Sequence, residues 1–128
     1  MDLTITNEAL TYIKKRLPEA AYYLLTADDG SNQYSAGGGA CSVGDTFQVV
    51  GVKELEAPYD IKMENSQEVP FYTSKNDTTF FEPGMKIDFK SNFLQLKNDG
   101  GMMDGQVTTK DATKNENAAG ISGDIKGC

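Results

Sequence analysis

The cysteine at position 41 is the residue of this chain whose type and setting point most directly to chemistry. It lies in Gly37-Gly38-Gly39-Ala40-Cys41-Ser42-Val43-Gly44, a turn of small residues in which glycine permits close approach of the backbone. A thiol placed there can reach a metal, a cluster or another thiol. The chain has no histidine, and its second cysteine is Cys128. One cysteine cannot build a metal site alone, so any ligand set needs help from elsewhere.

Two interpretations of Cys41 remain open from its surroundings. It can be a thiolate ligand or reactive thiol on a loop, or a small buried apolar side chain beside glycines. No basic residue lies within several positions to activate it. Without histidine, the usual nucleophile–base pairs of covalent catalysis cannot be assembled, so we expect that the protein is not an enzyme.

Other chemical patterns have simpler explanations. Asp28 and Asp29, and further along Asp99 and Asp104, form acidic clusters of the kind that hard cations use. Their spacing does not match a calcium loop, and turn residues that bond their own backbone are the favoured interpretation. The glycine triplet at 37–39 lacks the lysine and following helix of a phosphate-binding loop.

Composition restricts the partners and the compartment. The chain has 128 residues with 19 acidic and 12 basic side chains, a formal charge of −7, and Arg16 as its single arginine. That charge argues against nucleic acid and anionic membrane as partners. No apolar run approaches a membrane span, and the first residues do not resemble a signal peptide. We therefore expect a cytoplasmic protein in which both cysteines are free thiols.

The elements that must position Cys41 follow from hydrophobic spacing. Apolar residues from Ala9 to Leu17 recur at helical intervals after a cap at Thr6 or Asn7, and Pro18 ends this helix. Strand character follows, with a short strand that contains Pro70 expected at a sheet edge. The expected strands lie at 3–5, 22–26, 46–52, 59–63, 69–72, 85–89 and 93–96.

This order predicts an α+β fold. One N-terminal helix would pack on a mostly antiparallel, small β-sandwich-like arrangement of sheets. The strand at 93–96 is expected to be the last of the core, followed by a polar loop through Met102 and Met103. We place one domain at 1–107 and a polar, weakly structured tail at 108–128, because the tail has few large apolar residues.

The order of these parts resembles the HesB-like, A-type iron–sulfur cluster assembly family. The match begins with Thr6-Asn7-Glu8-Ala9-Leu10, similar to the family's opening helix. Gly39-Ala40-Cys41-Ser42-Val43-Gly44 is similar to its turn with the first cysteine. Met85-Lys86-Ile87-Asp88-Phe89 and Phe93-Leu94-Gln95-Leu96-Lys97-Asn98 match its later strands. The resemblance covers about residues 1–107 and implies a HesB-like fold.

The resemblance implies a protein of iron–sulfur cluster biosynthesis that binds iron or a cluster. Cys41 is the main ligand that carries over, and Cys128 is a second candidate. The family's Cys-Gly-Cys segment is absent, since Asp99-Gly100-Gly101-Met102-Met103-Asp104-Gly105 occupies its place. The implied partners are assembly or recipient proteins and further copies in a homo-oligomer. The alternative is a degenerate protein-binding or regulatory module that no longer binds a cluster.

Overall fold

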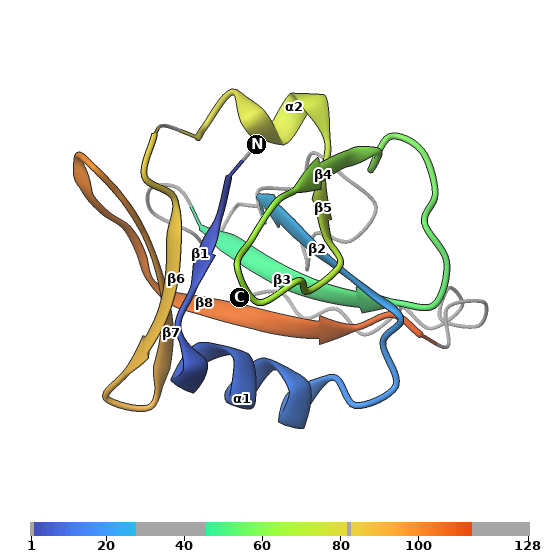
Figure 1. Ribbon diagram of the computed structural model, residues 1–128, viewed down its shortest axis with the longest axis horizontal. Helices are drawn as coiled ribbons and strands as arrows, with labels where there is room; N and C mark the ends of the chain where they lie inside the picture. Colours follow the sequence, from blue (N-terminus) through green and yellow to red (C-terminus); the bar gives the residue numbers. More distant parts are fainter. Residues whose placement is uncertain (1, 28–45, 82, 114–128) are drawn as a thin grey trace, which may run out of the picture.

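The computed structural model describes residues 2–27, 46–81 and 83–113, which form a strongly curved sheet with helices beside it (Figure 1). The helices in these ranges are α1 (Asn7–Arg16) and α2 (Lys75–Thr78). The strands are β1 (Thr4–Ile5), β2 (Tyr22–Ala27), β3 (Phe47–Val52), β4 (Ile61–Met63), β5 (Phe71–Thr73), β6 (Lys86–Lys90), β7 (Phe93–Asn98) and β8 (Gly101–Asp111).

The eight strands described belong to a single mixed sheet in the order β1-β6-β7-β8-β3-β2-β5-β4. The pairs β1–β6, β2–β5 and β3–β8 are parallel, and the other neighbours are antiparallel. The predicted mostly antiparallel, sandwich-like arrangement with one N-terminal helix is therefore wrong. The sheet curls into a half-barrel, and α2 is a second short helix. Alternation identifies a strand but not its partner, and each parallel pair joins segments far apart in sequence.

The two edges of the sheet are brought together at the N-terminus. Asp2 and Glu64 form an isolated parallel bridge, and the Leu3 backbone N–H donates to the Glu64 carbonyl at 2.8 Å. The Gln67 side-chain amide then donates to the Ile5 carbonyl at 3.0 Å. The segment after β4 thereby covers the outer edge of β1, which leaves less backbone open to unwanted strand pairing.

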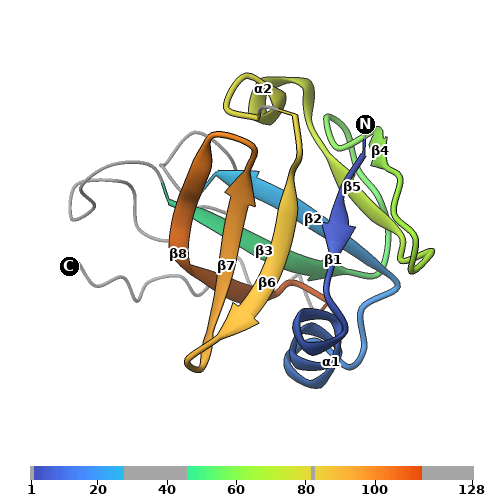
Figure 2. The ribbon, with the colours of Figure 1, turned by 60° about the vertical axis from the view of Figure 1, so that its left-hand side comes forward.

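Helix α1 forms where the sequence predicted it. The Thr6 hydroxyl accepts from the Ala9 backbone N–H at 3.1 Å, which caps the first turn. Glu8 lies in that first turn, and the basic residues 14–16 lie in the last turn, where each charge suits the helix dipole. Ala9 and Ile13 are fully buried in the main core, and Figure 2 shows α1 below β1 and β6 at one end of the curled sheet.

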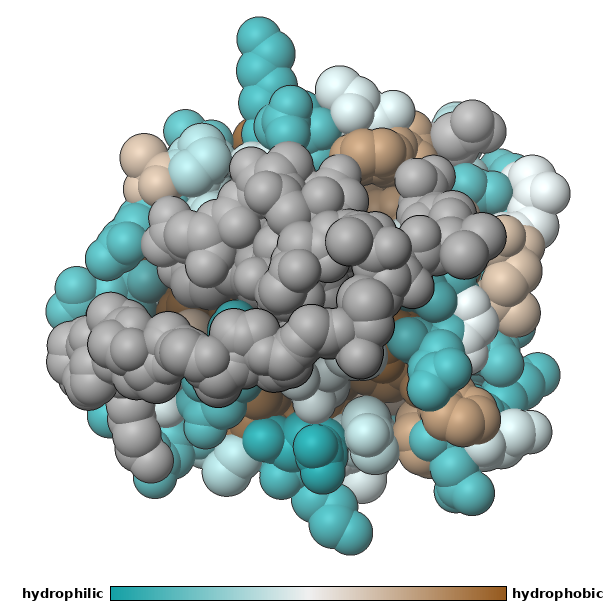
Figure 3. Space-filling view, turned by 180° about the vertical axis from the view of Figure 1, so that it is seen from behind, coloured by the Kyte–Doolittle hydropathy of each residue, from teal (hydrophilic) through white to brown (hydrophobic). Residues whose placement is uncertain are grey.

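The core divides between the two faces of β2 and β3. Tyr23, Leu25 and Val49 belong to the large cluster that also includes α1, whereas Leu24 and Val50 belong to a smaller cluster on the other face. This division follows from strand alternation, because successive side chains point to opposite faces. The described surface seen from behind is mostly hydrophilic, with scattered apolar patches (Figure 3).

The β6–β7 hairpin is confirmed, and its turn has a clear backbone reason. Ser91 and Asn92 have φ of 54° and 73°. Two consecutive residues with positive φ are typical of the tight turn that suits the twist of a hairpin. The register pairs Lys90 with Phe93 and Ile87 with Leu96.

Two expectations about strands fail. Residues 101–105 are not part of a polar loop, since β8 is an 11-residue strand between β7 and β3. The strand after Pro70 is not at an edge, since β5 lies between β2 and β4. Pro70 comes just before β5 and contributes only its carbonyl, which accepts from the Tyr23 N–H at 2.9 Å, so its missing N–H disturbs no ladder.

Candidate functional site

Cys41 and Cys128 lie outside the described residues, at 28–45 and 114–128. The structure does describe the two strands that flank the cysteine segment in sequence. β2 ends at Ala27 and β3 begins at Phe47, and these strands are antiparallel neighbours with Ala27 opposite Phe47. The candidate site begins at this pair of strand ends. We use the name loop base for Ala27 and Phe47 together with the side chains that hold them, which are Ser74, Asp77 and Asp104.

A buried carboxylate holds the first end of the loop base. Asp77 is 2% exposed, and its Oδ1 accepts from the Ala27 backbone N–H at 3.0 Å. Its Oδ2 accepts from the Ser74 hydroxyl at 2.7 Å, while the Asp77 N–H donates to that same hydroxyl at 3.1 Å. The Ser74 hydroxyl thus caps the start of α2 and is itself held by the Asp77 carboxylate. The helix cap and the end of β2 are thus fixed by one side chain.

A second carboxylate holds the other end. Asp104, on β8, accepts from the Phe47 backbone N–H through Oδ2 at 2.8 Å and from the Gln106 N–H through Oδ1 at 2.9 Å. The Phe47 ring packs against Phe80 and Phe81, with ring centroids 5.8 and 6.2 Å apart. The start of β3 is therefore held both by a charge-assisted hydrogen bond and by aromatic packing.

Neighbouring polar side chains at the loop base are buried and paired. The Gln48 amide donates to the Thr26 hydroxyl at 3.3 Å on one face of β2 and β3. The Thr73 hydroxyl donates to the Leu25 carbonyl at 2.7 Å. All three side chains are at most 1% exposed. Buried polar groups of this kind fix one arrangement of strands when they are satisfied.

A complete metal-ligand set does not occur in the described part of the chain. Among residues 2–27, 46–81 and 83–113, no three side chains of His, Cys, Asp or Glu converge on one point. Asp99 lies in the β7–β8 turn, where its N–H donates to the Pro83 carbonyl at 2.9 Å, and Asp104 serves the loop base. Asp28 and Asp29 lie outside the described residues.

Asp88 is a second buried carboxylate, at 6% exposure on β6. Burial alone would raise its pKa, but hydrogen bonds from the Phe89 N–H at 2.8 Å, the Thr6 hydroxyl at 3.1 Å and Lys97 at 3.5 Å outweigh it. The pKa of Asp88 is therefore held below its usual range. Because Thr6 also caps α1, Asp88 ties the start of the helix to the β6–β7 hairpin.

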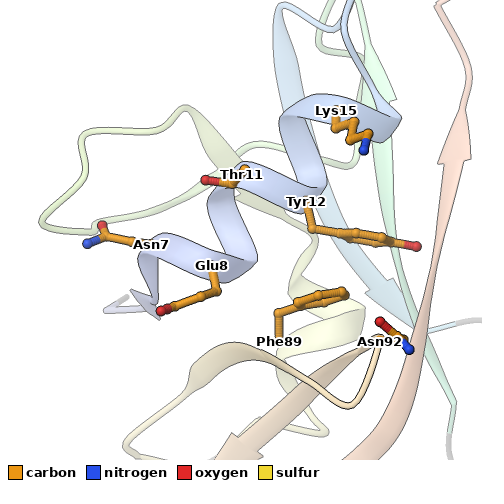
Figure 4. Close-up of a pocket in the computed structure, with 7 residues that line it drawn as sticks. All are labelled: Asn7, Glu8, Thr11, Tyr12, Lys15, Phe89 and Asn92. Carbon is orange, nitrogen blue, oxygen red and sulfur yellow. The ribbon is translucent and has the colours of Figure 1, made fainter.

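A groove of about 660 Å³ lies between α1 and the β6–β7 turn (Figure 4). The rings of Tyr12 and Phe89 stack in it, with centroids 4.5 Å apart and planes at 22°. Glu8 lies toward the start of the helix and Lys15 toward its end. The groove has no sulfur or imidazole among its lining residues, so it offers apolar contact rather than soft-metal ligands.

Sequence reasoning missed Asp77 and Asp104 as residues that organise the cysteine segment. The spacing Ser74-Lys75-Asn76-Asp77 is a signal for a helix cap, and it could have marked Asp77 as a structural carboxylate. Nothing local to Asp104 indicates that it reaches β3.

Neither of the described helices has the length and apolar character that a membrane span requires.

Comparison with known proteins gives a consistent result. A family model described as iron-sulphur cluster biosynthesis matches residues 1–111. A candidate Fe-S biosynthesis protein from Lactobacillus acidophilus is 29% identical with a TM-score of 0.74, and the match covers 87% of this chain and 90% of that chain. A candidate Fe-S biosynthesis protein from Lactobacillus salivarius, described as having a novel fold, is 21% identical with a TM-score of 0.63, covering 87% and 98%. No curated protein matches.

Proposed function

Because the chain belongs to the iron–sulphur cluster biosynthesis family, we propose that it handles iron or an iron–sulfur cluster as cargo, with Cys41 as the main ligand. The observation that carries this proposal is the family match over residues 1–111, which includes the segment with Cys41. We also propose that the protein acts as a carrier rather than an enzyme, and that it works in the cytoplasm.

The loop base supports this role by physical argument. A loop that presents a ligand works best when rigid elements fix its ends. Asp77 holds the last residue of β2 and Asp104 holds the first residue of β3, each through a backbone N–H. Charge-assisted hydrogen bonds are stronger than neutral ones, so both ends keep a defined position on the sheet.

The remaining ligands come from outside the loop in this proposal. Iron–sulfur clusters are held by about four thiolates, and one chain supplies Cys41 and Cys128. A homo-oligomer, a small thiol or an assembly or recipient protein would complete the set. Incomplete coordination suits a carrier, because cargo that is shared between two molecules can pass from one to the other.

Anaerobic reconstitution with ferrous iron and sulfide tests the proposal. Visible absorbance and iron content are measured for the parent, for Cys41→Ser, and for Cys128→Ser as the matched control. We expect charge-transfer bands in the parent that Cys41→Ser abolishes and Cys128→Ser weakens less. Equal bands in the parent and Cys41→Ser would refute the role of Cys41.

A second candidate function is a protein-binding module without cargo. It is favoured by the sequence Asp99-Gly100-Gly101-Met102-Met103-Asp104-Gly105, which forms the β7–β8 turn and the start of β8 and contains no cysteine. The absence of iron and of any band in the reconstituted parent would favour this alternative over the carrier.

A further inference from the structure

The outer face of the β6–β7 hairpin is rich in lysine although the chain as a whole is acidic. Residues opposite each other on paired strands point to the same side of a sheet. The register therefore groups Lys86 with Lys97, Asp88 with Gln95, and Lys90 with Phe93, and β8 adds Met102 opposite Lys97. We call this surface the basic face, formed by Lys86, Asp88, Lys90, Phe93, Lys97 and Met102.

The basic face is open to solvent. Figure 2 shows β6, β7 and β8 in front of the rest of the sheet, and no described helix or strand lies over them. The inward residues Ile87, Leu94 and Leu96 are buried in the core. The Lys90 side chain is 63% exposed. This part of the sheet thus has one side packed on the core and one side that no described helix or strand covers.

The charge of the basic face is positive although the chain carries −7. Asp88 is its one acidic residue, and the Asp88 carboxylate lies 3.5 Å from the Lys97 ammonium and 3.8 Å from that of Lys90. The three lysines Lys86, Lys90 and Lys97 against the single Asp88 carboxylate leave a net surplus of two positive charges on the face. A local surplus of positive charge on a negatively charged molecule attracts an acidic partner to that surface.

Apolar side chains accompany this charge. Among the described residues, Phe93 at 45% and Met102 at 54% are the large hydrophobic side chains that are exposed. Both lie on the basic face, near opposite ends of β7. Exposed aromatic and methionine side chains surrounded by polar groups are typical of protein interfaces.

We propose that the basic face docks an acidic segment of a partner protein that also presents apolar side chains to Phe93 and Met102. Charge argues against a second copy of this chain as the occupant. A two-fold contact of the face with itself would bring lysines against lysines, since such an interface joins identical patches. This surface is independent of Cys41, so the proposal goes beyond cargo handling and does not depend on it.

The test titrates the isotope-labelled full chain with a synthetic peptide in which glutamate alternates with leucine, and follows backbone amide shifts. The matched peptide has glutamine in place of glutamate. We expect shifts confined to β6, β7 and the start of β8, and binding that weakens with added salt. The glutamine peptide should bind at least about fivefold more weakly, because it lacks the charges that pair with lysine.

Variants place the binding on this face. Lys86→Gln combined with Lys90→Gln should weaken the affinity about fivefold or more, while Lys53→Gln combined with Lys62→Gln removes the same charge elsewhere and should change it less than about twofold. Phe93→Ser tests the apolar part without any change of charge. Shifts outside the face, equal effects of the two lysine pairs, or no binding would overturn the proposal, as would sedimentation showing that the chain covers this face with another copy.

Discussion

The loop base and the basic face each depend on a buried carboxylate, but the partners differ. At the loop base, Asp77 accepts from the Ala27 backbone N–H and the Ser74 hydroxyl. On the basic face, Asp88 accepts from the Phe89 N–H and the Thr6 hydroxyl, and it also faces two lysines. The first carboxylate fixes the course of the backbone, whereas the second also sets the charge of a surface.

The same type of side chain, a buried aspartate, thus serves two purposes in this acidic chain. The Ala27 N–H and the Ser74 hydroxyl are neutral donors, and through them the buried Asp77 carboxylate holds a strand end and a helix cap. Lysine ammonium groups around Asp88 are partly exposed, at 27% and 63% of their side chains. The charges around Asp88 are therefore accessible to a partner protein, whereas the Asp77 carboxylate itself is buried.

The largest effect on the free energy of unfolding is expected at Asp77. Asp77→Ala leaves the Ala27 N–H and the Ser74 hydroxyl without this acceptor in a buried place, so we expect the free energy of unfolding to fall by about 3 kcal/mol. Urea denaturation measures it. Asp60→Ala, at an exposed position, is the control and should cost less than about 0.5 kcal/mol. A loss at Asp77 no larger than at Asp60 would contradict the role of the loop base.

The next largest effect is expected at Asp88, where the contribution to the free energy of unfolding depends on pH. The folded-state pKa lies below the usual 3.8, so the stability from ionised Asp88 is present above about pH 4 and is lost as the pH falls through the lowered value. We expect Asp88→Asn to cost about 1.5 kcal/mol at pH 7 and little at strongly acidic pH. Urea unfolding of both proteins across this range checks it, and a difference that stayed constant with pH would count against the ion pairs.

A smaller loss is expected at the other end of the loop base. Asp104 is half-buried, so water can replace the acceptor that the Phe47 N–H loses in Asp104→Ala. We expect the free energy of unfolding to fall by about 1 kcal/mol. Hydrogen exchange of the Phe47 amide should also become faster, and an unchanged exchange rate there would exclude the contact.

The smallest effect on stability is expected on the basic face itself. Phe93 is 45% exposed, so Phe93→Ser should change the free energy of unfolding by less than about 0.5 kcal/mol. Thermal denaturation of the parent and the variant measures this. A large loss would mean that Phe93 serves the core rather than a surface.

Local signals in the sequence predicted the parts of the fold that have local causes. Helix α1 was predictable because Thr6, Glu8 and Pro18 mark its ends, and the β6–β7 hairpin because Ser91-Asn92 separates two alternating runs. β8 was missed because glycine, aspartate and polar residues dominate it. β8 is held in the sheet by its pairing with β7 and β3, and the sequence of β8 itself does not identify these partners.

The candidate site likewise has residues that local sequence identifies and residues whose roles depend on distant contacts. Cys41 stands out by its residue type and its glycines, and the family match was recognisable from the order of short motifs. Asp77 and Asp104 contact Ala27 and Phe47 across 50 and 57 positions of sequence. Such contacts come from the sheet topology, so they could not be foreseen until the order of strands was known.

The parallel pairing of β1 with β6 has a consequence for synthesis of the chain. Ile5 is aligned with Ile87, so the first strand has no partner in the sheet until most of the chain has left the ribosome. β3 waits still longer for β8, since Gln48 is aligned with Thr108. Contacts between distant segments slow folding. We therefore expect the nascent protein to remain open while it emerges and to close in a late step, with its N-terminus among the last parts to dock.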